Sequence, residues 1–294
     1  MYHGGSGRDN VPGFPHHPHA GMETITTVFK GLCDHSDSLG SVGRFGNGDT
    51  QFMTAGAGLS HAEMFPMLHD EESGGENTLS LFQIWLNLPS KSKQAEPGYK
   101  MNWSEDTPAW TVPDANGREA SVHPIVGQYA DKPAPPPPPP ASWAADPENE
   151  VALWTIEVPE GGTFTVPAAK RGDDINRKLF LYEGSASIDG KVFQVDTGVQ
   201  VKASADVVIE ANQGDGNGTC KLLLLQGRPI NEPVVQHGPF VANSREGIAA
   251  IFEKYQRTRF GGWPHDVDGP VHGDLSVGRF AKYGDGTVEK KGQN

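Results

Sequence analysis

The chain has 294 residues, of which 36% are hydrophobic, and a formal net charge of −13. Nucleic-acid-binding proteins usually carry a basic patch, so this charge argues against direct binding of DNA or RNA. The 37 glycines and 24 prolines favour short strands joined by tight turns over a helical bundle.

Signals for export, membrane insertion and disulfide formation are missing from the sequence. The residues ahead of His17 have neither the basic nor the apolar segment of a signal peptide. No apolar stretch approaches the roughly 20 residues that cross a bilayer. Cys33 and Cys220 are too far apart in sequence to suggest a disulfide framework or a zinc ribbon. We therefore expect an intracellular protein, cytoplasmic or nuclear, with no membrane contact.

Strand patterns occupy the first hundred residues. Residues 24–29 are β-branched and aromatic, and a turn at Gly48-Asp49 leads into a second such run at residues 50–54. Residues 79–87 alternate apolar and polar side chains, as in a strand with one buried face. These patterns predict an N-terminal β-domain over residues 1–100.

A proline-rich segment follows. Residues 101–150 contain an unbroken proline run, Pro135–Pro140. Because proline cannot donate to a strand ladder, we expect an extended, polyproline-II-like connector. A spacer on the surface is a commoner use of such a run than recruitment of SH3 or WW domains.

Strand patterns resume at Val151 and predict a C-terminal β-domain over residues 151–262. Asp189-Gly190 between two short apolar runs is a strong hairpin signal. The expected strands cover residues 153–158, 163–166, 178–182, 185–188, 191–193 and 220–225. The two halves resemble weak repeats of one architecture, so we predict an all-β fold with two β-domains.

One helix is expected, over residues 244–259. Its apolar residues recur at helical spacing, with Asn243 as the N-cap and Glu246 completing a capping box. The polar, glycine-rich residues 263–294 are predicted to be a loop-like tail.

Two segments carry the chemistry, residues 13–23 and 56–64. On a strand, residues i and i+2 face the same side, so His17 and His19 share one face, and His61 and Glu63 share another. If both segments line one interior, three imidazoles and one carboxylate converge. Such a set suits a first-row divalent metal ion with positions left for water or substrate.

Other assignments compete with this one. A lone histidine in a half-buried strand is usually a hydrogen-bonded structural residue. Glu23 follows His19 by four residues and competes with Glu63 as a carboxylate ligand, which periodicity alone does not decide. His16 should face away from His17. The remaining histidines are expected to be surface or structural residues: His3, His35, His69, His123, His237, His265 and His272.

The sequence resembles the pirin family. The resemblance lies in the segments FPHHPHAGMET, GDTQFMTAG, GLSHAEM, QIWLNLP and EPGY of the first half, and in LLLQGRPINEPVV and GPFVAN of the second. It implies two cupin-type β-barrels, a bicupin, with iron in the N-terminal barrel only. It implies His17, His19, His61 and Glu63 as the metal ligands, in preference to Glu23.

The start of the chain departs from that pattern. Pirins usually carry some tens of residues, including early strands, ahead of the histidine motif, whereas this chain starts almost at the motif. Either the start of the chain is truncated or the missing strands are dispensable, and a barrel open at one edge would have backbone groups without partners.

The resemblance implies two functions. One is a dioxygenase similar to quercetin 2,3-dioxygenases, acting with O₂ on a flavonol or a related enolic or phenolic compound, with Glu63 accepting the substrate's hydroxyl proton. The other is a non-enzymatic, redox-responsive co-regulator that binds a protein partner. One mononuclear Fe(II)/Fe(III) ion is implied, although the same ligands would also accept copper, nickel, manganese or cobalt.

Overall fold

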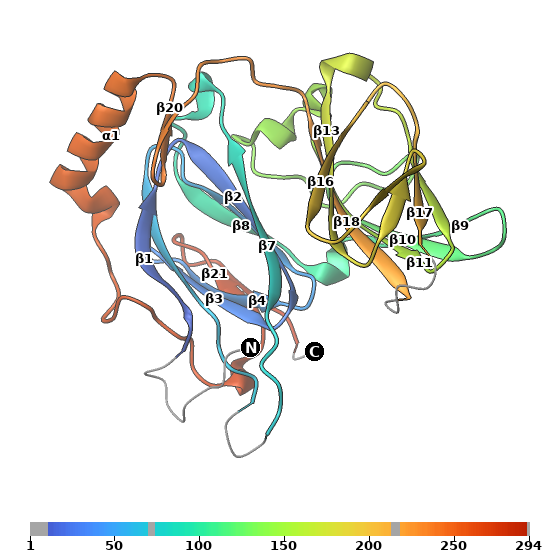
Figure 1. Ribbon diagram of the computed structural model, residues 1–294. Coiled ribbons are helices and arrows are strands. Elements are labelled where there is room, and N and C mark those ends of the chain that lie inside the picture. Colours follow the sequence, from blue (N-terminus) through green and yellow to red (C-terminus); the bar gives the residue numbers. More distant parts are fainter. Residues whose placement is uncertain (1–10, 70–73, 213–217, 293–294) are drawn as a thin grey trace. The chain divides into compact units, whose positions relative to one another are not determined.

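The computed structural model describes residues 11–69, 74–212 and 218–292, and is built mainly of β-strands (Figure 1). The chain divides into two compact units. The first comprises Met1–Ser104, Pro139–Ser142 and Asn231–Asn294, and the second Glu105–Pro138 and Trp143–Ile230. Among the described residues no helix is long and apolar enough to cross a membrane.

The first unit contains a six-stranded and a four-stranded antiparallel sheet. The six-stranded sheet runs β1 (Gly13–His19), β6 (Leu59–Met64), β3 (Leu32–Asp37), β4 (Val42–Gly46), β21 (Phe280–Lys282) and β22 (Val288–Lys290). The four-stranded sheet runs β7 (Ser80–Asn87), β2 (Met22–Lys30), β5 (Thr50–Thr54) and β8 (Gly98–Asn102). Its core includes residues of both sheets, among them Val28, Phe45, Met53 and Leu59, so the sheets pack face to face.

Among the described residues the six-stranded sheet ends at β1, the strand that carries His17 and His19. The backbone N–H of His16 donates to the carbonyl of Asp268 at 2.8 Å, and that of Ala20 donates to Pro239 at 3.3 Å. Two segments from the later part of the chain therefore accept hydrogen bonds from backbone N–H groups at or next to this strand.

Part of the expected tail is strand. β21 pairs with β4, and β22 pairs with β21, so the prediction of a loop is wrong for these residues. Arg279 precedes β21 and forms a buried ion pair with Asp49, and the hydroxyl of Tyr99 donates to the carbonyl of Lys282. Strands of three residues leave little periodicity to read from sequence.

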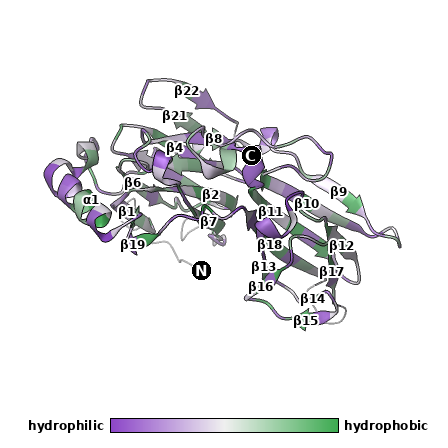
Figure 2. Cartoon of the chain, turned by 90° about the horizontal axis from the view of Figure 1, so that it is seen from above, coloured by the Kyte–Doolittle hydropathy of each residue, from purple (hydrophilic) through white to green (hydrophobic). Residues whose placement is uncertain are grey.

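The helix α1 (Arg245–Thr258) lies close to where it was predicted, but its cap differs. Ser244, not Asn243, is the N-cap and accepts from the N–H of Gly247, while the Asn243 amide donates to Glu232 and Pro233. Figure 2 shows hydrophilic residues along much of the helix. Ile248 is the one residue of α1 that is buried. The helix packs on a hairpin of the same unit, β19 (Val235–His237) and β20 (Phe240–Ala242).

The second unit also has a six-stranded and a four-stranded sheet. The first runs β16 (Thr197–Val201), β13 (Asn176–Glu183), β18 (Thr219–Gly227), β11 (Ala152–Pro159), β10 (Glu119–Val126) and β9 (Trp110–Pro113). The second runs β12 (Thr163–Val166), β17 (Val207–Ala211), β14 (Ala186–Ile188) and β15 (Lys191–Phe193). Its core draws on both sheets.

The predicted connector is only partly irregular. Its residues in β9 and β10 extend the larger sheet of the second unit, because β10 pairs with β11. The proline run Pro135–Pro140 lies outside helices and strands. The all-β class with a short helix is confirmed, although the described strands of each unit form separate sheets and not a closed barrel.

Candidate functional site

Three histidines converge inside the first unit. β1 pairs antiparallel with β6, and this register places His17 directly opposite His61. The ring centroids lie 4.5 Å apart for His17 and His61, 5.0 Å for His17 and His19, and 5.1 Å for His19 and His61. One nitrogen from each ring can be chosen so that all three lie within 4.8 Å of one another.

Most ring nitrogens of this cluster have no hydrogen-bond partner among the described residues. His19 and His61 are buried, and none of their ring nitrogens makes a hydrogen bond to a described residue. His17 Nδ1 lies 2.9 Å from the carbonyl oxygen of Pro15, which can only accept, so Nδ1 carries the proton and Nε2 is left for a ligand. Buried polar atoms are rarely left unsatisfied, so the two buried rings, with the Nε2 of His17 beside them, fit a metal ion.

The environment keeps the buried histidines neutral, as metal ligands must be. Burial lowers the pKa of His61 well below its usual value, and the charges of His17, His19 and His35 add to the effect. Burial lowers the pKa of His19 to about 3, again with help from His17. The backbone carbonyl of Pro239 acts in the opposite direction and raises the pKa of His19, although it lies outside hydrogen-bond geometry to either ring nitrogen.

Glu63 lies beside the cluster, on the same strand as His61. Its Oε2 is 3.8 Å from Nε2 of His61. Nε2 of Gln83 on β7 donates to both carboxylate oxygens, at 2.9 and 2.8 Å. Burial raises the pKa of Glu63, and the hydrogen bond from Gln83 opposes this rise because it favours the charged form.

Glu23, the competing carboxylate, has other partners. Its Oε2 accepts from the hydroxyl of Thr54 at 2.8 Å, and its Oε1 accepts from Ser142 at 2.6 Å. Burial raises the pKa of Glu23, and these two hydroxyls lower it. Glu23 is therefore engaged by hydroxyl groups, whereas Glu63 stands next to His61.

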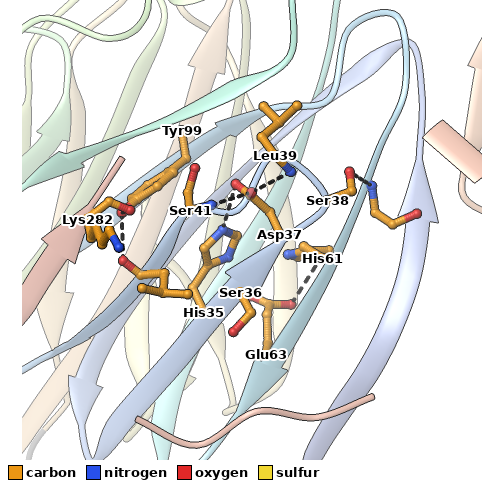
Figure 3. A network of polar contacts seen from close by, with 12 residues as sticks. His35, Ser36, Asp37, Ser38, Leu39, Ser41, His61, Glu63, Tyr99 and Lys282 are labelled. Atoms are coloured by element: carbon orange, nitrogen blue, oxygen red, sulfur yellow. Dashed lines mark hydrogen bonds and ion pairs between the residues drawn. The ribbon is translucent and has the colours of Figure 1, made fainter. Parts of the chain in front are cut away.

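A second polar pair lies on β3, next to β6 (Figure 3). The register places His35 opposite Glu63 and Asp37 opposite His61. His35 Nε2 is 3.3 Å from Asp37 Oδ2, both side chains are fully buried, and Asp37 Oδ1 accepts from the N–H groups of Leu39 and Ser41. His35 was expected from the sequence to be a surface or structural residue, and it lies buried in a strand. The signal that could have placed it is the i, i+2 spacing of His35 and Asp37 in a strand beside the ligand strand.

The other histidines lie away from the cluster. His16 stacks on Trp263, with ring centroids 4.8 Å apart, and its Nδ1 is 3.2 Å from Asp268. His272 Nε2 lies 2.8 Å from the carbonyl of His35. His69 and His237 are exposed, His123 and His265 are partly buried, and His3 lies outside the described residues.

Comparison with known proteins identifies the family. The Pirin family model matches residues 1–86, and the model for the pirin C-terminal cupin domain matches residues 153–261. The chain belongs to the pirin family. The second unit, which holds most of that C-terminal match, contributes no residue to the histidine cluster among its described residues.

Relatives support the membership along most of the chain. A pirin-like protein of Caulobacter vibrioides is 34% identical over 252 residues, covering 86% of this chain and 82% of the relative. Pirin-1 of Arabidopsis thaliana is 33% identical over 252 residues, covering 85% and 78%. The crystal structure of quercetin 2,3-dioxygenase from Acinetobacter baumannii superposes with a TM-score of 0.71 at 28% identity, covering 87% of this chain and 82% of that one. The cupin fold predicted from the sequence is confirmed.

Proposed function

We propose that this pirin-family chain is a metal-dependent dioxygenase that acts with O₂ on a flavonol such as quercetin, or on a related enolic or phenolic compound. The observation that carries the proposal is the convergence of three histidines beside the buried carboxylate of Glu63. Two of them, His19 and His61, are buried with no hydrogen-bond partner at either ring nitrogen among the described residues. Similarity to the quercetin 2,3-dioxygenase of Acinetobacter baumannii supports the reaction class.

His17, His19, His61 and Glu63 would hold one mononuclear metal ion. Three neutral imidazoles and one carboxylate suit Fe(II) or Fe(III), and would also accept copper, nickel, manganese or cobalt. A divalent ion bound there would supply Lewis acidity toward a hydroxyl oxygen and a centre that reacts with O₂. A site with one carboxylate stays net positive, so it favours an anionic oxygen of the substrate.

The protein's own contribution to proton transfer lies with Glu63. A buried carboxylate with a raised pKa is a better base near neutral pH than an exposed one. Glu63 would take the proton of the flavonol 3-hydroxyl, and Gln83 keeps both carboxylate oxygens oriented while it does so. Burial of His19 and His61 excludes water from this side of the site.

The test is quercetin consumption under air by the iron-reconstituted protein, with His61→Ala prepared identically. We expect turnover in the wild type and its loss in the variant. A folded, iron-loaded wild type without turnover on quercetin or on simpler enols and phenols would overturn the proposal. The role would then be that of a redox-responsive co-regulator, whose partner should bind the Fe(II) and Fe(III) forms with different affinity.

A further inference from the structure

One side chain links the candidate carboxylate to the surface of the first unit. Gln83 and Trp85 are two residues apart on β7, so their side chains share one face of the sheet. The register places Gln83 opposite Thr26 of β2 and Trp85 opposite Thr24. Nε2 of Gln83 donates to both oxygens of Glu63, and Oε1 of Gln83 accepts from the indole Nε1 of Trp85 at 3.1 Å.

The hydrogen bonds of Gln83 allow only one orientation of its amide. Nε2 also donates to the hydroxyl of Thr26 at 3.2 Å, so both amide protons are used. An indole N–H can only donate, and an ionised carboxylate can only accept. A flipped amide would set a donor against Trp85 and an acceptor against Glu63. The indole of Trp85 therefore helps to fix the amide group that holds Glu63.

Trp85 also borders the histidine cluster. Its ring centroid lies 5.2 Å from that of His19, with the planes at 88°. Although its N–H points inward to Gln83, the residue is 45% exposed. A partly exposed indole ring beside the cluster could stack with a planar aromatic molecule.

We infer that Gln83 is a positioning residue for Glu63, and that Trp85 both fixes the Gln83 amide and offers its ring to an aromatic substrate. The positioning role needs only the hydrogen-bond chain from Trp85 through Gln83 to Glu63. The stacking role rests on the proposed dioxygenase function. A substrate that stacks on Trp85 would thereby meet a carboxylate already held in place.

The first test is binding of Co(II), followed by competition with a chelator and by visible absorption, because neither readout needs turnover. Gln83→Met keeps the length of the side chain but removes its donors. We expect it to weaken Co(II) binding about 10- to 100-fold, the range typical when the partner of a metal ligand is lost. Its absorption bands should shift as the carboxylate changes its contact with the ion. Trp85→Phe keeps a ring but loses the N–H, and should weaken binding less, by under about 10-fold.

Gln51→Met is the matched control. Gln51 is a buried glutamine on β5 of the same sheet, and its amide has no hydrogen-bond partner among the described residues. Equal Co(II) affinity and spectra in the two glutamine variants would overturn the positioning role. If Gln83→Met does not fold, the near-isosteric Gln83→Glu, which sets a carboxylate against Glu63, takes its place. Co(II) affinity and spectra equal to those of Gln51→Met would again overturn the positioning role.

Kinetics with quercetin test the stacking role separately. Gln83→Met should lower kcat with little change in KM, whereas Trp85→Leu, which removes the ring, should raise KM several-fold. An unchanged KM in Trp85→Leu would overturn the stacking role. If the wild type turns over no quercetin, the proposed function fails, while the Co(II) measurements still decide the role of Gln83.

Discussion

Arg279 and Asp49 form an ion pair inside the first unit, with Nη1 2.7 Å from Oδ1 and both side chains almost completely buried. Asp49 also accepts from the backbone N–H groups of Gly46 and Ser104. The pair joins the segment before β21 to the turn between β4 and β5, so two distant parts of the chain depend on it.

Arg279→Met should therefore destabilise the protein by about 3–5 kcal/mol, because it leaves the Asp49 charge buried without its cation. The measurement is urea unfolding followed by tryptophan fluorescence. Arg171→Met is the control, since the pair of Arg171 with Glu148 at 2.8 Å is exposed to solvent and should contribute less than about 1 kcal/mol. Equal effects of the two substitutions would contradict the prediction.

Metal binding should stabilise the wild type and not His61→Ala. A ligand at 100 times its Kd adds about 2.7 kcal/mol to the free energy of unfolding when it binds only the folded state. We expect Co(II) to raise the unfolding midpoint of the wild type, and a chelator to reverse the shift. A similar rise in His61→Ala would show that the ion binds elsewhere.

The metal-free protein should respond to acid through His19. Its pKa is about 3 in the folded state and near 6.5 when unfolded, so the unfolded state binds the extra proton first as pH falls. The contribution of neutral His19 to the free energy of unfolding is complete above pH 6.5. It is lost progressively below that pH, by up to about 1.4 kcal/mol per pH unit.

The comparison that isolates this effect is wild type against His19→Asn, unfolded by urea at several pH values between 7.5 and 5 with chelator present. The buried carboxyls Glu23 and Glu63 shift in the opposite sense and are common to both proteins. The stability difference between the two proteins should shrink as pH falls. A difference that stays constant across this range would refute the assignment to His19.

Gly56 should not tolerate a side chain. It has a φ of +45°, and a Cβ there would lie 2.2 Å from the carbonyl oxygen of Ala95, which also accepts from the N–H of Ala57. Gly56→Ala should cost at least about 2 kcal/mol more than Gly286→Ala, since Gly286 also has a positive φ, +88°, but open space around it. Thermal unfolding of the two variants provides the comparison, and equal midpoints would disprove it.

The period of two along a strand accounts for what the sequence could predict at the site. It placed His17 with His19, and His61 with Glu63, and the pairing of β1 with β6 then brought the three histidines together. Their role as metal ligands stays a prediction. The preference for Glu63 over Glu23 came only from the family resemblance.

Contacts between side chains of two facing sheets could not be predicted from the sequence. Gln83 meets Glu63 because strands of two different sheets face each other, and no local pattern encodes that approach. The same holds for β21, a three-residue strand whose partner β4 lies far away in sequence. The cap at Ser244 was missed because neighbouring Asn243 is an equally good capping residue.

The pairing of β21 with β4 has a consequence for synthesis of the protein. Arg279 and Asp49 are 230 residues apart, and residues 105–138 and 143–230 of the second unit lie between them in the chain. A ribosome delivers the histidine strands early, yet the sheet that carries β1 and β6 gains β21 only after the second unit has been translated. Pairings of such long range fold slowly, because a large loop must close first. Until β21 is translated, β4 is therefore expected to be an edge strand with unpaired backbone groups. During this interval the nascent first unit would be most exposed to aggregation and would depend most on a chaperone.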